Sequence, residues 1–317
     1  MIKNDHVAGA LDIGSNTLKM LVVEKTVDGL REVGQRTSET RISAGISQNN
    51  PALKEESMAR AIAVIGELYR DMMVYHPDKV RMVATSAVRD ASNRDVFCKR
   101  VLKETGCPVD VISGEEEAQL IGCGVLTDPA LKDQREILVF DMGGGSVECI
   151  YIKDRKIQFA ESLPLGGVRL LEHHVADPSQ PLKDTEIQAV VDSVARHVSR
   201  IPLQLEDPDK ALVVGAGGTW ITTRAMLAHR DGKTLEASSP YLELKDLESV
   251  FSEAASYTLE QRLQMPKLPR NRADVFPVTL LALMELGKWA GVTHFYNCFH
   301  SLRWGVASSL LENTRES

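Results

Sequence analysis

Short runs of apolar residues alternate along this chain with segments in which apolar residues recur every three or four positions. The first pattern predicts strands and the second predicts helices. The clearest helix is expected over residues 55–75, where Met58, Ile62, Ile65 and Met72 share one face. Further strands are predicted over residues 7–12, 19–25, 80–85, 109–112, 136–140 and 147–153, and further helices over 95–105 and 115–125. Strands that alternate with helices in this way indicate an α/β fold.

Two glycine turns, each headed by an aspartate, lie between predicted strands. They read Asp12-Ile13-Gly14-Ser15-Asn16-Thr17 and Asp141-Met142-Gly143-Gly144-Gly145-Ser146. Strand, turn and strand therefore occur twice, which is a weak internal repeat, and residues 126–134 resemble a linker between the two copies. Two related domains that face each other across a cleft would produce this pattern.

The turns suit the binding of phosphate. An aspartate at the end of a buried strand is held rigidly and can coordinate a hard cation. Glycines allow a sharp turn and let successive backbone N–H groups approach an anion. Ser15, Asn16, Thr17 and Ser146 can add side-chain donors. The alternative is a hairpin that needs glycine only for its backbone, but three consecutive glycines and the duplication argue against it.

A third glycine cluster follows a predicted strand and precedes a helix expected from Ile221. It contains Gly215, Gly217, Gly218 and Thr219. Free N–H groups at a helix N-terminus attract phosphate or the polar edge of a nucleotide. Close packing of the strand against the helix explains the same glycines equally well.

Two charged side chains, Glu148 and Arg89, are further candidates. Glu148 lies within a strand, where glutamate is disfavoured, and this suggests that it faces a cleft. Arg89 follows a strand and could bind phosphate as a planar fork. A surface ion pair of Arg89 with Asp90 or Asp95 is an equal alternative.

Glu117 lies in a run of three glutamates at the start of a predicted helix. Ser113 and Glu116 have the spacing of a capping box, which assigns Glu116 a structural role. The capping box assigns no structural role to Glu117, and the spacing of Glu117 alone indicates a solvated carboxylate.

Composition narrows the function classes. At 317 residues the chain is long enough for two domains, and its net charge of −7 opposes broad nucleic-acid binding. No stretch approaches the roughly 18 apolar residues of a membrane span, and we expect a cytoplasmic protein. The five cysteines form no C-x-x-C pair and are expected to be reduced and mostly buried. A nucleophilic cysteine has no local signature here.

These motifs together resemble the exopolyphosphatase and guanosine pentaphosphate phosphatase (Ppx/GppA) family, within the actin-like ATPase superfamily. The resemblance covers nearly the whole chain. Besides the two turns, it rests on three runs, which read Ile112-Ser113-Gly114-Glu115-Glu116-Glu117-Ala118, Ser162-Leu163-Pro164-Leu165-Gly166-Gly167-Val168-Arg169-Leu170 and Arg272-Ala273-Asp274-Val275. The chain departs from the family pattern at Val278 and Ser301, where glycine is usual, and it ends without the C-terminal helical extension of longer members.

The resemblance implies a fold and a division of roles. Two ribonuclease-H-like domains would flank a cleft, the first over residues 1–127 and 299–317 with a returning C-terminal helix, the second over 128–298. Glu117 would act as general base on water, and Asp141 and Glu148 would hold Mg²⁺ or a similar divalent cation, with Asp12 contributing. Phosphate oxygens would be bound by Asp12, Gly14, Ser15, Asn16, Thr17, Arg89, Gly143, Gly144, Gly145 and Ser146.

Hydrolysis of the terminal phosphoanhydride of inorganic polyphosphate is the leading function. Guanosine pentaphosphate is the near alternative as substrate and would need a base pocket, expected around Gly215–Trp220. A kinase of the same superfamily, or a non-catalytic sensor of polyphosphate or guanosine tetraphosphate, are the other hypotheses. No nucleic acid or membrane partner is expected, and a homodimer remains open.

Overall fold

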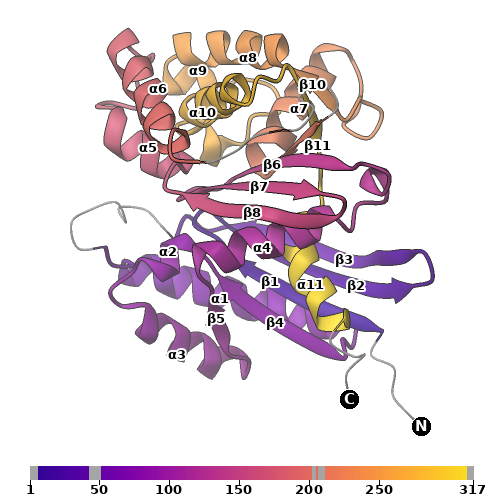
Figure 1. Cartoon of the computed structure of the whole chain (residues 1–317). Coiled ribbons are helices and arrows are strands. Elements are labelled where there is room, and N and C mark those ends of the chain that lie inside the picture. Colours follow the sequence, from indigo (N-terminus) through magenta and orange to yellow (C-terminus); the bar gives the residue numbers. More distant parts are fainter. Residues whose placement is uncertain (1–5, 43–50, 202–204, 206–210, 313–317) are drawn as a thin grey trace. The chain divides into compact units, whose positions relative to one another are not determined.

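The chain forms two compact α/β units. The computed structural model describes residues 6–42, 51–201, 205 and 211–312 (Figure 1). The first unit comprises Met1–Asp133 and His300–Ser317, and the second comprises Gln134–Phe299. Within the described residues, no helix is long and apolar enough to cross a membrane.

The first unit is built on a five-stranded mixed sheet of order β3-β2-β1-β4-β5 (Figure 1). β1 pairs antiparallel with β2 and parallel with β4, so one hairpin and one crossover connection meet at β1. Its strands are β1 Val7–Ile13, β2 Thr17–Thr26, β3 Gly29–Glu39, β4 Lys79–Ala84 and β5 Val109–Val111. Its helices are α1 Glu55–Met73, α2 Ser86–Arg89, α3 Arg94–Thr105, α4 Gly114–Val125 and α11 Leu302–Glu312, with a 3₁₀ turn η1 at Pro129–Leu131.

The second unit repeats this arrangement and extends it. Its sheet has the order β10-β11-β9-β6-β7-β8, in which β8-β7-β6-β9 corresponds to β3-β2-β1-β4. The strands are β6 Glu136–Met142, β7 Val147–Lys153, β8 Lys156–Leu163, β9 Leu212–Ala216, β10 Tyr241–Glu243 and β11 His294–Asn297. The helices are α5 Gly167–His174, α6 Asp184–Val198, α7 Gly218–Arg230, α8 Leu244–Ser256, α9 Leu259–Arg262 and α10 Phe276–Trp289, and a 3₁₀ turn η2 spans Arg270–Arg272.

This repetition confirms the predicted fold class of two related α/β domains. Asp12 and Asp141 each occupy the last-but-one position of the first strand of their unit. Each strand then runs through a glycine turn into an antiparallel partner. The internal repeat predicted from the two turns is therefore a repeat of whole sheets.

Burial explains which elements the sequence pattern missed. β3 is an edge strand that is mostly exposed, so its residues lack the apolar alternation that predicts a strand. The helix expected from Ile221 begins three residues earlier, at Gly218. The expectation that most cysteines are buried is wrong, because only Cys149 and Cys298 are buried and Cys123 is exposed, although all five are free thiols.

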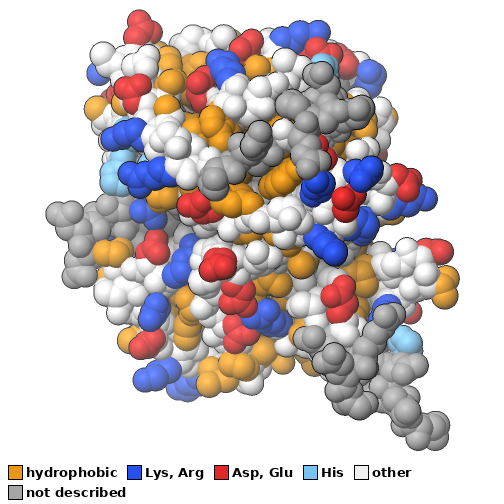
Figure 2. Space-filling view, viewed as in Figure 1, with side chains coloured by type: hydrophobic (Ala, Val, Ile, Leu, Met, Phe, Trp, Pro, Cys, Tyr) orange, Lys and Arg blue, Asp and Glu red, His pale blue; other side chains and the backbone are white. Residues whose placement is uncertain are grey.

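Charged side chains of both signs are mixed on the surface. Lysine and arginine lie among aspartate and glutamate over the face shown in Figure 2.

The C-terminal helix α11 packs on α4 through glycines. A Cβ atom at Gly305 would overlap the carbonyl oxygen of Leu120 and lie 3.0 Å from the backbone nitrogen of Gly124. Gly124 in turn faces the backbone of Ser301. The two helix backbones therefore approach as closely as they do only because both contact positions lack a side chain.

We predict that Gly305→Ala destabilises the protein, although the same change stabilises most helices. Overpacking at this contact should lower the free energy of unfolding by about 1–3 kcal/mol. Urea denaturation followed by circular dichroism measures the change, with Ser309→Ala on the same helix as control. An equal or higher stability for Gly305→Ala would show that the two helices can separate at no cost.

Candidate functional site

Both glycine turns are closed by the same hydrogen bond. The amide of Gly14 donates to the carbonyl of Thr17 at 3.1 Å, and the amide of Gly143 donates to the carbonyl of Ser146 at 2.9 Å. Each bond ties the end of the first strand to the start of the second. The residues between the two bonded residues form the tip of the turn.

The amides at each tip are open. In the first unit, no hydrogen bond joins the amides of Ser15 and Asn16 to any residue that the structure describes. The same holds in the second unit for the amides of Gly144, Gly145 and Ser146. Successive N–H groups that lack internal partners form a concavity that binds anions. Because backbone N–H groups rarely stay unpaired, such groups are satisfied by water or by a ligand.

Hydrogen bonds from neighbouring segments fix the first turn in place. The carbonyl of Asn16 accepts hydrogen bonds from the amides of Thr40 and Arg41, at 3.0 and 3.1 Å. The hydroxyls of Ser15 and Ser86 lie 3.0 Å apart in a buried contact. Ser86 was not predicted as a site residue, because nothing in the sequence indicates that α2 meets this turn.

The second turn carries two buried carboxylates. Asp141 and Glu148 are direct cross-strand partners in the β6–β7 pair, so their side chains leave the same face of the sheet. Glu148 is only 2% exposed, and it accepts a hydrogen bond of 2.7 Å from the hydroxyl of Ser162 on β8. Ser162 was missed as a site residue, although it follows from the register once β7 and β8 are aligned.

The equivalent pair in the first unit has opposite charges. Asp12 is the cross-strand partner of Lys19, whose ammonium nitrogen lies 3.7 Å from Asp12 Oδ2. Burial lowers the pKa of Arg303, and the nearby carboxylate of Asp12 partly offsets this effect. Asp12 therefore lies near two cations of its own unit, whereas Asp141 faces a second carboxylate.

Glu117 is buried and paired. It is 6% exposed at the start of α4, and Arg89 Nη1 donates to its Oε2 at 2.9 Å and to the carbonyl of Ile112 at 3.0 Å. The spacing-based expectation of a solvated carboxylate is wrong, because the end of α2 brings Arg89 to this position. Arg89 lies 4.0 Å from Asp90, so Glu117 is its closer carboxylate partner.

The capping box predicted at this helix forms only in part. Ser113 accepts a hydrogen bond from the amide of Glu116 at 3.1 Å. The carboxylate of Glu116 instead pairs with Arg81 at 2.8 Å. Glu116 is exposed and Glu117 is buried, so adjacent glutamates on one helix have different surroundings.

Packing explains the third glycine cluster. Gly217 has a φ of +95°, and a Cβ atom there would lie 2.7 Å from Asp141 Oδ1. Gly215 lies against the Trp220 ring, and Gly218 lies against the guanidinium of Arg272. Thr219 is buried at the start of α7. The packing alternative thus accounts for the three glycines, and nucleotide binding at this cluster stays a prediction.

The donor set at the second turn fits a hard divalent cation. Among the described residues, no three His, Cys, Asp or Glu side chains are grouped so that they could hold a metal ion. Two like charges directly opposite each other on a sheet repel one another. Mg²⁺ commonly takes one or two carboxylates and completes its coordination with water and substrate phosphates.

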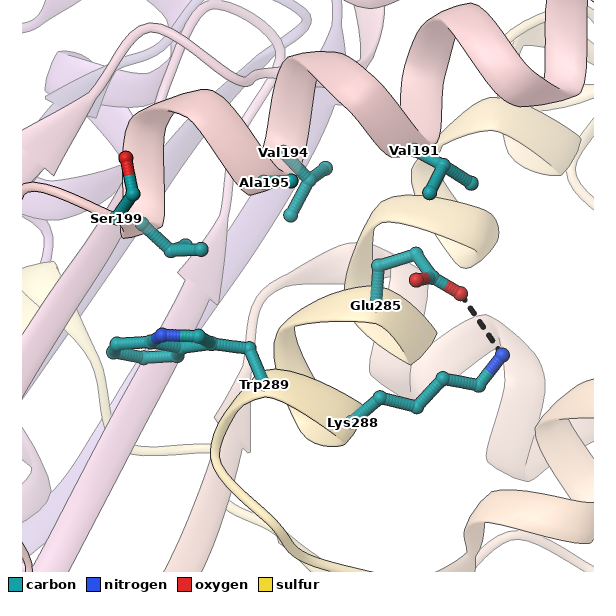
Figure 3. Close-up of a pocket in the computed structure, with 8 residues that line it drawn as sticks. Val191, Val194, Ala195, Ser199, Glu285, Lys288 and Trp289 are labelled. Carbon is teal, nitrogen blue, oxygen red and sulfur yellow. Dashed lines mark hydrogen bonds and ion pairs between the residues drawn. The ribbon is translucent and has the colours of Figure 1, made fainter.

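An apolar hollow of about 260 Å³ lies between α6 and α10 (Figure 3). Val194 of α6 lies across it from Trp289 of α10, Val191 lies nearer to Glu285, and Glu285 pairs with Lys288 at 2.9 Å. No residue that the sequence predicts for the site lines this hollow.

Comparison with known proteins decides the family. The sequence profile of the Ppx/GppA phosphatase family matches residues 21–313. The chain belongs to the Ppx/GppA phosphatase family. The resemblance found in the motifs is therefore confirmed, and the chain is a member of a family of hydrolases.

Solved structures of this family share its fold. An exopolyphosphatase-like protein is 25% identical, with a TM-score of 0.87 and 99% of each chain covered. An exopolyphosphatase from Cytophaga hutchinsonii is 24% identical, with a TM-score of 0.85, over 98% of this chain and 99% of that one. The Ppx/GppA family member of Aquifex aeolicus is also 24% identical, with a TM-score of 0.79 over the same shares.

Four of the five cysteines of this Ppx/GppA chain lack the surroundings of nucleophiles. Burial raises the pKa of the Cys149 thiol to about 12 and also raises the pKa values of Cys98, Cys107 and Cys123. A thiol with a raised pKa is protonated at neutral pH and reacts slowly.

We therefore predict that Cys123→Ser, at the exposed thiol, changes the rate of phosphate release by less than about twofold. Wild-type protein treated with iodoacetamide at pH 7 should likewise keep its activity. A large loss of activity in the folded variant would restore a thiol-based mechanism.

Proposed function

We propose that this chain hydrolyses the terminal phosphoanhydride of inorganic polyphosphate and releases orthophosphate. The observation that carries the proposal is the pair of matching turns, each of which leaves successive backbone amides open. Transfer of a phosphoryl group needs mainly positioning and neutralisation of charge. In each unit, open amides can bind the oxygens of a substrate that consists only of linked phosphates.

Glu117 is the general base of the proposed reaction. Its carboxylate takes a proton from water as the water oxygen attacks the terminal phosphorus. The bond from that phosphorus to the bridging oxygen breaks, and its electron pair stays on the shortened chain. Arg89 supports this role because its hydrogen bond to Oε2 fixes the position of the carboxylate.

Asp141 and Glu148 are the residues that we propose for the cation. A bound Mg²⁺ would neutralise negative charge on the phosphate oxygens as the bond breaks. The Ser162 hydroxyl fixes Glu148, and Gly217 leaves the space in which the Asp141 carboxylate lies. The sequence predicts Asp12 as a third contributor, but Lys19 makes it the weakest of the three.

We predict that Glu117→Gln lowers kcat for phosphate release by about 10²–10⁴-fold, because the amide cannot accept the proton of water. The KM for tripolyphosphate should change by less than about threefold, since the phosphate-binding amides are untouched. Glu116→Gln is the matched control, because Glu116 is the adjacent carboxylate but is exposed and paired with Arg81. Activity of Glu117→Gln close to that of Glu116→Gln would exclude Glu117 as the base.

We also predict that Asp141→Asn and Glu148→Gln each weaken Mn²⁺ binding, used as a probe for Mg²⁺, by at least about tenfold. Asp12→Asn should weaken it by less than about threefold, because Lys19 already compensates Asp12. Electron paramagnetic resonance of free Mn²⁺ measures the affinity without any turnover. Equal losses in all three variants would make Asp12 a full ligand, and no loss at Asp141 or Glu148 would exclude this cation site.

A further inference from the structure

The second turn is held by a segment that follows β8. The carbonyl of Gly143 accepts a hydrogen bond from the amide of Gly167 at 3.1 Å. The carbonyl of Gly144 accepts from the amides of Val168 and Arg169, at 2.8 and 3.3 Å. The start of α5 thus binds the turn by its backbone.

One side chain completes this contact. Arg169 Nε donates to the carbonyl of Gly145 at 3.0 Å. The carbonyls of all three glycines therefore accept hydrogen bonds from residues 167–169, while the amides of Gly144, Gly145 and Ser146 stay open within the described residues.

Close backbone contact supports the same arrangement. A Cβ atom at Gly166 would overlap the backbone of Gly145 and Ser146, so this segment lies flat on the turn. The first unit uses the same device, since Thr40 and Arg41, which follow β3, donate to the carbonyl of Asn16. In both halves of the repeat, the segment that follows the third strand therefore donates hydrogen bonds to a carbonyl of the turn.

We infer that Arg169 is a positioning residue that fixes the three-glycine turn with its amides directed to the phosphate chain. Three consecutive glycines can adopt many conformations, and only some of them align their N–H groups. Hydrogen bonds to all three carbonyls select one conformation before a ligand arrives, which reduces the entropy lost on binding. This inference rests on the proposed function, because it assigns phosphate binding to the open amides.

The test compares Arg169→Ala and Arg169→Lys with Arg196→Ala. Arg196 is the matched control, because its Nε also donates to a carbonyl, that of Asp192 at 3.2 Å, but on an exposed face of α6. Arg169→Ala should raise the KM for tripolyphosphate about tenfold and leave kcat within about threefold. Arg169→Lys should recover part of the loss, and Mn²⁺ affinity should be unchanged in both because the carboxylates lie on strands.

Hydrogen exchange separates positioning from folding. In Arg169→Ala, peptides that span residues 141–148 should exchange faster, while the rest of the second unit keeps its protection. Faster exchange throughout the second unit, or a KM equal to that of Arg196→Ala, would overturn the inference.

Failure of the proposed function gives a different result. If the wild-type protein releases no phosphate, calorimetric binding of tripolyphosphate to wild type and Arg169→Ala still decides the matter. Weaker binding by the variant supports the positioning role, and equal binding excludes it.

Discussion

A backbone turn that leaves its amides unpaired is the constraint on which the site depends. Unpaired N–H groups are unfavourable unless water or a ligand satisfies them, so a stable protein keeps them only where the surrounding structure holds them open. In each unit the closing bond of the turn and the hydrogen bonds to its carbonyls do this. Glycine is needed at Gly166 because the supporting segment touches the turn backbone, and at Gly217 because the Asp141 carboxylate lies against it.

The two units use one scaffold for different electrostatic tasks. Position for position, Lys19 in the first unit corresponds to Glu148 in the second, since each faces the aspartate that heads the turn. The first unit therefore contributes its own positive charge beside Asp12. The second presents two carboxylates, which we propose as the ligands of a divalent cation. A single metal site would follow from this asymmetry.

Local sequence predicted much of the fold and some of the contacts of the candidate site. Asp-x-Gly turns between apolar runs indicated the repeated hairpins, because such signals depend on neighbours in the chain. The edge strand β3 was missed because its exposed residues carry no apolar alternation. The pairing of Arg89 with Glu117, and the contact of Arg169 with Gly145, join residues far apart in sequence, and spacing contains no information about them. Glu117 shows the difference most clearly, since spacing indicated a solvated side chain and the fold buries it.

The most direct test of the account is a parallel measurement of phosphate release from polyphosphate, guanosine pentaphosphate and ATP, each with and without Mg²⁺. The account predicts release from polyphosphate that depends on Mg²⁺ and exceeds release from ATP. Release mainly from guanosine pentaphosphate would keep the chemistry but change the substrate. Binding of all three without release would contradict the account and make the chain a sensor.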